Sequence, residues 1–171
     1  MNTSSHKWTL MLVLIGLLAG TSFGQWKAGD PLPDLSGVQL SNPAPDLADQ
    51  VVLLDFWASW CTPCKKSFPV LIDLHKKYAG QGLIVLAVSV DENPAQMDQF
   101  LKDNPVPFPV VRDTAQQLVE AAGIEAMPTS FLIDAQGVIR YVHTGFHAES
   151  TPEEYEEQIK ELLALKSGGA P

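Results

Sequence analysis

The residues with the clearest capacity for chemistry are two cysteines, Cys61 and Cys64, which are separated only by Thr62 and Pro63. An apolar run over residues 51–57 precedes the pair, and a segment with helical periodicity follows it. Cys61 is therefore expected at the N-terminus of a helix, where free backbone N–H groups and the helix dipole favour a thiolate. Cys64 would lie one turn later, within reach of a disulfide bond. The spacing predicts a couple that exchanges two electrons with an external disulfide.

Two other uses of the cysteine pair compete with redox exchange. A zinc site would need two further ligands beside the two cysteines of the chain. His143 and His147 are four residues apart, but they follow a predicted strand and do not share a predicted helix. A purely structural disulfide would close a very short loop, which gives little entropic stabilisation. The pattern therefore favours redox chemistry, with no bound metal and no cofactor.

Three neighbours of the pair have predicted roles. Asp55 interrupts the apolar strand before Cys61, so its carboxyl is expected to be buried, with a raised pKa. It would accept the proton of Cys64 when that thiol attacks a mixed disulfide; the alternative is an ordinary aspartate at a strand end. Trp57 is expected in the core. Trp60, next to Cys61, is expected to shield the sulfurs or to contact the substrate.

The rest of the chain predicts the elements that hold these residues. Strands are predicted over 51–57, 83–90, 107–112, 129–134 and 138–143, and helices over 62–78, 93–102, 114–122 and from 151 onward. A short strand is also expected near Gly37 to Leu40, in a lead-in rich in Pro, Asp and Gly. The early strand–helix–strand order and the late hairpin predict an α/β fold, a mixed central sheet flanked by helices.

Residues 1–24 have the order of a secretory signal peptide: a polar start that ends in Lys7, an apolar run, and small residues up to Gly24. Cleavage after Gly24 would leave residues 25–171 as one domain. The apolar run is shorter than the roughly 20 residues that span a bilayer, and an uncleaved membrane anchor is the alternative. Either way the domain is expected in the periplasm or another extracytoplasmic compartment, where disulfides persist.

Charge limits the class of partner. The chain has 171 residues, with 11 Lys and Arg against 20 Asp and Glu, and a net charge of -9. Such an acidic chain lacks the basic stripe that releases counterions from a phosphate backbone. Nucleic acid is therefore not an expected partner.

Several segments together resemble one known family. VVLLDFWASWCTPCKKSFP is similar to the active-site stretch of the thioredoxin superfamily, and more narrowly of its TlpA/ResA-like thiol–disulfide oxidoreductases. GIEAMPTSFLIDAQGVI resembles the family's cis-proline strand and hairpin, and LIVLAVSVDEN with FPVVRD resembles its central strand–helix insert. GDPLPDL resembles its N-terminal extension. The resemblance covers residues 29–165 and implies a thioredoxin-like fold with that extension and insert.

The resemblance also implies roles for individual residues. Cys61 would be the exposed nucleophile and Cys64 the resolving thiol. The Met127–Pro128 bond, whose isomer the residues alone leave open, would be cis, and the backbone of Met127 would pair with an extended substrate segment. Glu92 falls near a carboxylate that approaches the cysteines in some reductases of the group. The alternative for Glu92 is a solvated loop.

The direction of electron flow is argued from the residues between the cysteines. Thr62 and Pro63 include no His that would stabilise a Cys61 thiolate, which favours a reductant. The family's usual targets are disulfides of apocytochrome c and of copper-site proteins, with electrons from a membrane thiol transporter, and the protein is expected to be a monomer. A disulfide-forming oxidant is the alternative. A peroxiredoxin-type peroxidase would have Thr and Pro where Ala58 and Leu54 stand, and a copper-delivery protein would have C-x-x-x-C spacing.

Overall fold

The computed structural model describes residues 24–168, so the predicted leader lies outside the described residues apart from Gly24. Five strands and four α-helices follow in the order β1 (Val51–Trp57), α1 (Thr62–Tyr78), β2 (Leu83–Ser89), α2 (Pro94–Asp103), β3 (Val110–Arg112), α3 (Gln117–Ala122), β4 (Thr129–Ile133), β5 (Ile139–Thr144) and α4 (Thr151–Ser167). Within the described residues, no helix is both long and apolar enough to cross a membrane.

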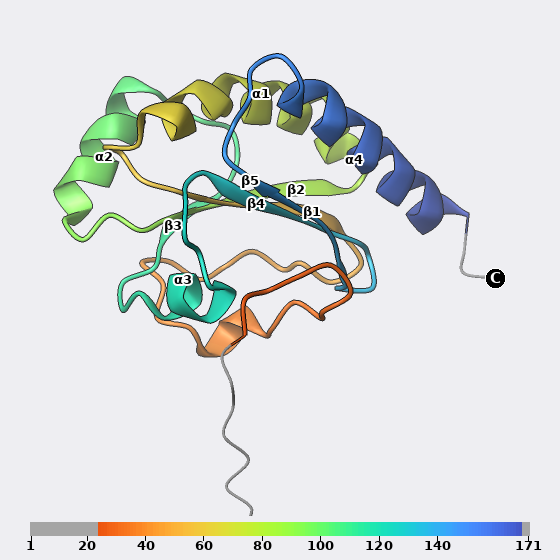
Figure 1. Ribbon diagram of the computed structural model, residues 1–171, viewed down its shortest axis with the longest axis horizontal. Helices are drawn as coiled ribbons and strands as arrows, with labels where there is room; N and C mark the ends of the chain where they lie inside the picture. Colours follow the sequence, from red (N-terminus) through yellow and green to blue (C-terminus); the bar gives the residue numbers. More distant parts are fainter. Residues whose placement is uncertain (1–23, 169–171) are drawn as a thin grey trace, which may run out of the picture.

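The strands form one mixed sheet in the order β3-β2-β1-β4-β5. β1 pairs in parallel with β2, and β2 with β3, whereas β4 is antiparallel to both β1 and β5. Figure 1 shows α1, α2 and α4 on one face of the sheet, and α3 with the N-terminal segment on the other. This is the thioredoxin-like α/β arrangement that the sequence predicts.

The central strand explains where the cysteines lie. Every residue of β1 is buried, because the strand lies at the centre of a sheet that has helices on one face and the N-terminal segment on the other (Figure 1). Parallel β1 and β2 end side by side, with Trp57 opposite Ser89. The chain leaves β1 at this edge, turns, and begins α1 at Thr62. The cysteines therefore lie at the carboxyl edge of the parallel part of the sheet.

The segment before β1 differs from the prediction. The strand expected near Gly37 to Leu40 is absent from the described residues. A 3₁₀ turn over Leu35–Gly37 takes its place, and Leu40 makes only an isolated bridge to Asp113. The prolines of this segment lack the N–H that a continuous ladder needs. The segment is nevertheless held to the sheet by Trp26, whose ring packs edge-on against Phe131 at 5.4 Å.

Candidate active site

The two cysteines lie in the turn between β1 and α1. Their sulfurs form a disulfide bond, with the Cα atoms 5.3 Å apart. Cys61 is the N-cap residue of α1, and its Sγ accepts a hydrogen bond from the backbone N–H of Cys64 at 3.2 Å. A thiolate on Cys61 would be stabilised by that donor and by the positive end of the helix dipole. The geometry therefore suits a reversible dithiol–disulfide couple.

The cysteines differ in their access to solvent. Cys61 is 6% exposed, whereas Cys64 is wholly buried. Lys65 continues the helix, and its backbone N–H donates to the carbonyl of Cys61 at 3.1 Å. An incoming disulfide reaches Cys61 before Cys64, so the geometry favours Cys61 as nucleophile and Cys64 as the thiol that resolves the mixed disulfide.

Asp55 is wholly buried in β1, as expected from its place in an apolar strand. Burial raises the pKa of its carboxyl to about 7, although a hydrogen bond from Ser130 acts in the opposite direction. A carboxyl with a pKa near neutrality can both accept and release a proton at physiological pH. Asp55 thus has the proton affinity that a general base requires.

Two hydroxyl groups from other elements form a chain that ends at this carboxyl. Ser130 of β4 lies opposite Asp55 in the sheet and donates a hydrogen bond from its Oγ to Asp55 Oδ1. The Tyr155 hydroxyl of α4 lies 2.7 Å from Ser130 Oγ. Burial, and then the charge of Asp55, raises the pKa of Tyr155, so its hydroxyl keeps its proton. Sequence reasoning missed both residues, because no local pattern brings positions 55, 130 and 155 together.

A second buried carboxylate, Asp91, holds the turn that leads to Cys61. Asp91 follows β2, and its Oδ2 accepts hydrogen bonds from the Ser59 backbone N–H at 2.9 Å and from Ser89 Oγ at 2.8 Å. Its Oδ1 accepts from Ser59 Oγ at 2.8 Å. Ser59 stands two residues before Cys61, so this carboxylate fixes the path of the chain into the active site. The signal for it was an acidic residue directly after a buried strand.

Glu92, the other member of the acidic pair, is exposed. Its carboxylate makes no hydrogen bond or ion pair among residues 24–168. The structure therefore connects Asp91, and not Glu92, to the turn that carries the cysteines. A role for Glu92 towards the cysteines stays a prediction.

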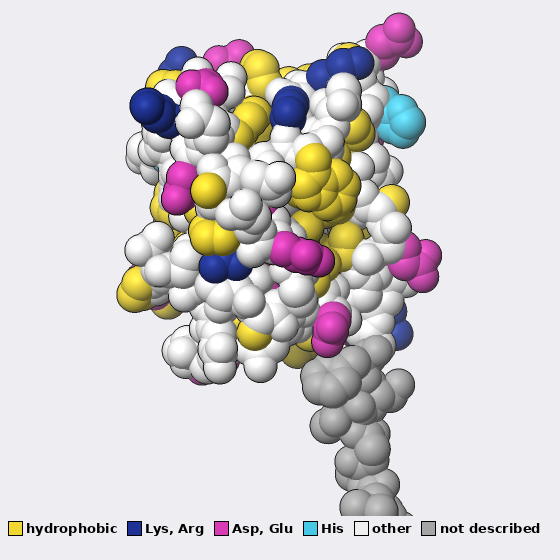
Figure 2. Space-filling model, turned by 90° about the vertical axis from the view of Figure 1, so that its left-hand side faces the viewer, with side chains coloured by type: hydrophobic (Ala, Val, Ile, Leu, Met, Phe, Trp, Pro, Cys, Tyr) yellow, Lys and Arg dark blue, Asp and Glu magenta, His cyan; other side chains and the backbone are white. Residues whose placement is uncertain are grey.

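The candidate substrate contacts lie on the surface or close to it. The Met127–Pro128 peptide bond is cis, as the resemblance implies, and the Pro128 carbonyl accepts a hydrogen bond from Gly145 at 2.7 Å. Met127 is half-buried, and Trp60 is 62% exposed. Figure 2 looks onto the edge where α1 begins and shows hydrophobic side chains gathered there among charges of both signs.

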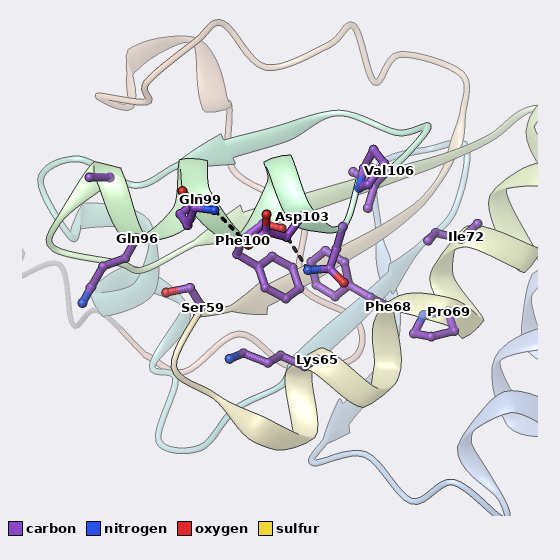
Figure 3. Close-up of a pocket in the computed structure, with 13 residues that line it drawn as sticks. Ser59, Lys65, Phe68, Pro69, Ile72, Gln96, Gln99, Phe100, Asp103 and Val106 are labelled. Carbon is purple, nitrogen blue, oxygen red and sulfur yellow. Dashed lines mark hydrogen bonds between the residues drawn. The ribbon is translucent and has the colours of Figure 1, made fainter.

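A groove of about 750 Å³ lies between α1 and α2. Figure 3 shows Phe68 and Phe100 at its centre, with Lys65 and Ser59 towards one end. The two rings pack edge-on at 5.3 Å, and the Lys65 ammonium lies 5.8 Å from the centroid of Phe100. Because Ser59 and Lys65 flank the cysteines in sequence, this end of the groove adjoins the active site.

His143 and His147 make hydrogen bonds to neighbouring residues. His143 Nε2 lies 2.7 Å from the amide oxygen of Gln158, and the His147 backbone N–H donates to Thr151 Oγ1. In the part of the chain that the structure describes, no three His, Cys, Asp or Glu side chains are grouped to hold a metal ion.

The fold and the relatives together define a thioredoxin-like thiol–disulfide oxidoreductase, an enzyme class, and the chain carries a Cys61–Cys64 disulfide at the start of α1. The chain belongs to the Redoxin family, whose model matches residues 27–159. Its relatives include the TlpA/ResA-like proteins that the sequence resembles.

Relatives of known sequence agree with this assignment. Thiol-disulfide oxidoreductase ResA from Bacillus subtilis (strain 168) is 36% identical over 165 residues, which cover 88% of this chain and 90% of the relative. ResA from Geobacillus kaustophilus (strain HTA426) is 32% identical over 158 residues, covering 88% of this chain and 91% of the relative.

Solved structures agree as well. A Chlorobium tepidum structure, provisionally named as a thiol:disulfide interchange protein DsbE, superposes with a TM-score of 0.74 at 37% identity. The match covers 80% of this chain and 98% of that one. StoA from Bacillus subtilis matches with a TM-score of 0.57 at 30% identity over 64% of this chain and 82% of its own.

Proposed function

We propose that the protein is an exported reductase of protein disulfides. The observation that carries this proposal is the Cys61 N-cap, with only Thr62 and Pro63 before Cys64. The helix N-terminus favours the Cys61 thiolate, but no His stands between the cysteines to stabilise it further. A reduced form that is only moderately stabilised gives up its electrons readily, which is the property of a reductant.

The proposed reaction has two displacement steps. The Cys61 thiolate attacks one sulfur of a substrate disulfide, forms the mixed disulfide, and releases the other substrate sulfur as a thiolate, which takes a proton from solvent. Asp55 then accepts the proton of Cys64. The Cys64 thiolate attacks the sulfur of Cys61, and the second substrate thiolate leaves. Two electrons have passed to the substrate, and the cysteines are joined as in the structure.

The proposed substrates are disulfide-bearing proteins, in particular apocytochrome c before haem attachment and copper-site proteins. An extended segment would contact Trp60 and the cis Pro128 and would pair with the backbone of Met127, with Glu92 close to the cysteines. A membrane thiol transporter would return the electrons, and the protein would work as a monomer outside the cytoplasm after cleavage of residues 1–24. The names of the ResA and DsbE relatives support the reaction class.

The reduction potential tests the direction of electron flow. The Cys61–Cys64 couple would be equilibrated against defined thiol buffers, with the fluorescence of Trp57 and Trp60 as readout. A potential below about -220 mV is expected for a dedicated reductase. A value of about -120 mV would instead identify a disulfide-forming oxidant, and the reductase proposal would fail.

The order of attack has its own test. Replacing Cys64 with Ala should trap a mixed disulfide between Cys61 and a substrate peptide, because the resolving thiol is gone. The matched Cys61→Ala variant should trap none, since Cys64 is wholly buried. Equal trapping by both variants would contradict the assigned roles.

A further inference from the structure

The carboxyl of Asp55 has two oxygens with different surroundings. Oδ1 accepts the hydrogen bond from Ser130 Oγ. Oδ2 is buried and has no hydrogen-bond partner among the described residues. A buried oxygen that lacks a hydrogen-bond partner costs folding free energy. Such an oxygen calls for an explanation, and a role in proton transfer is one. The two oxygens are therefore not equivalent towards a proton.

The hydroxyl chain fixes this difference. Ser130 has one O–H, which it donates to Asp55, so its oxygen is free to accept from Tyr155 at 2.7 Å. Tyr155 is wholly buried and keeps its proton, which makes it the donor of that pair. The two hydroxyls thus form a chain in which Tyr155 of α4 donates to Ser130 of β4, and Ser130 donates to Oδ1 of Asp55 in β1.

The surroundings contain few other groups that titrate. β1, β2 and β4 carry no ionisable side chain apart from Asp55. α4 contributes Tyr155, whose ring packs edge-on against His143 of β5 at 4.8 Å. His143 in turn lies 3.5 Å from Glu154 at the surface. Ser130 is therefore the polar group that contacts the Asp55 carboxyl, and Tyr155 acts on it through Ser130.

We propose that Ser130 and Tyr155 are positioning residues, which hold Asp55 Oδ1 as a permanent acceptor and make Oδ2 the oxygen that receives the Cys64 proton. The S–H bond of Cys64 breaks, an O–H bond forms on Oδ2, and the electron pair stays on the Cys64 sulfur. Ser130 donates to Oδ1 before and after the transfer, so the hydroxyl chain does not have to reorganise. This inference rests on the proposed role of Asp55 as general base.

The test measures the titration of Asp55 itself, in the oxidised protein, by its carboxyl infrared band, identified by its absence in Asp55→Asn. Ser130→Ala removes the donor to the ionised form and should raise the pKa of Asp55 by about one unit, a tenfold change in proton affinity. Tyr155→Phe should give a smaller rise, and Ser130→Thr should restore the original titration. The control Ser67→Ala removes an equally buried hydroxyl that donates to the Cys64 carbonyl, and should leave Asp55 unmoved.

A second measurement separates this inference from the role of Asp55. The pH profile of mixed-disulfide resolution, followed in a single turnover, should shift with the Asp55 titration in Ser130→Ala. An Asp55 pKa that is unchanged in both Ser130→Ala and Tyr155→Phe would overturn the inference. If the pKa of Asp55 shifts in Ser130→Ala while the pH profile of resolution does not, Ser130 does position the carboxyl. That result would contradict Asp55 as the general base and Oδ2 as the proton acceptor.

Discussion

At Asp55, one buried carboxyl links the stability of the protein to pH. Its pKa is about 7 in the folded protein, against an ordinary value of 3.8. Between these values the unfolded chain has released a proton that the folded chain still holds. Stability therefore falls as the pH rises from about 4 to 7 and levels off above that range. The loss amounts to about 4 kcal/mol for a shift of about 3 pKa units.

Asp55→Asn should abolish this dependence, because the amide does not ionise. Relative to wild type, the variant should gain up to about 4 kcal/mol of unfolding free energy between pH 4 and pH 8. Urea unfolding of the oxidised proteins at both pH values measures the gain. Asp98→Asn, which changes an exposed carboxylate of α2, should follow wild type. Parallel pH curves for Asp55→Asn and wild type would contradict the buried, protonated state.

The residues around Asp55 differ in how well the sequence predicts them. Asp55 was foreseeable, because a single charge in an apolar strand has few explanations. Ser130 and Tyr155 were not, because their importance depends on a strand pairing and a helix packing that join positions 75 and 25 residues apart. A side chain that acts through another residue has no recognisable motif in the sequence around it.

Among the elements, the turn between β1 and α1 depends on β2. Asp91, just beyond β2, accepts from the backbone and side chain of Ser59, and Val90 donates to the Trp57 carbonyl at 2.9 Å. The active-site turn is thus fastened to the neighbouring parallel strand, and not only to the helix that it starts.

Asp91→Ala should destabilise the protein by about 3 kcal/mol, since it leaves the half-buried N–H of Ser59 and the hydroxyls of Ser59 and Ser89 without their acceptor. Unfolding in urea at pH 7 would measure this loss. Asp98→Ala removes an exposed carboxylate from α2 and should change stability by less than about 0.5 kcal/mol. Equal effects of the two substitutions would show that the contacts of Asp91 do not hold the turn.

Elements were predictable to different degrees. The apolar runs of β1 and β2 and the helix after Cys61 were found almost to the residue, because long periodic segments specify their own structure. The prediction of a strand near Gly37 to Leu40 was wrong, because short segments take their conformation from the neighbours they pair with. Here Leu40 has a single bridging partner, Asp113.

The N-terminal segment before β1 contributes to the hydrophobic core of the molecule. Trp26 is nearly buried and packs against Phe56 and Phe131 on the face of the sheet opposite α1. Its backbone N–H donates to the carbonyl of Ala122 at 3.2 Å, which joins the segment to the end of α3. The extension therefore closes the second face of the sheet.

Trp26→Ala should cost about 3–5 kcal/mol of unfolding free energy, because it opens a cavity beneath the sheet. Trp60→Ala is the matched substitution at an exposed indole and should cost less than about 1 kcal/mol. Thermal and urea unfolding of both variants would compare them. Equal losses would place the extension outside the cooperative unit.

Net charge acts on encounters with partners. The net charge of the chain is -9, so cationic partners should be attracted to it. Salt screens this attraction beyond a Debye length of about 8 Å at physiological ionic strength. The rate of exchange with a Lys-rich disulfide peptide should fall as NaCl is raised, while the rate with a neutral peptide of the same length should change little. Stopped-flow fluorescence would record both rates. Identical salt profiles would show that charge does not guide docking.

The chain of Asp55, Ser130 and Tyr155 has a consequence for synthesis. The ribosome delivers these residues in that order, and α4, which contains Tyr155, follows all the other elements of the described residues. A nascent chain therefore carries both cysteines while the buried acid still lacks its outer hydroxyl. The hydrogen-bonded chain around the proposed base is complete only once α4 has docked, so the proposed mechanism needs this helix in place for full reactivity.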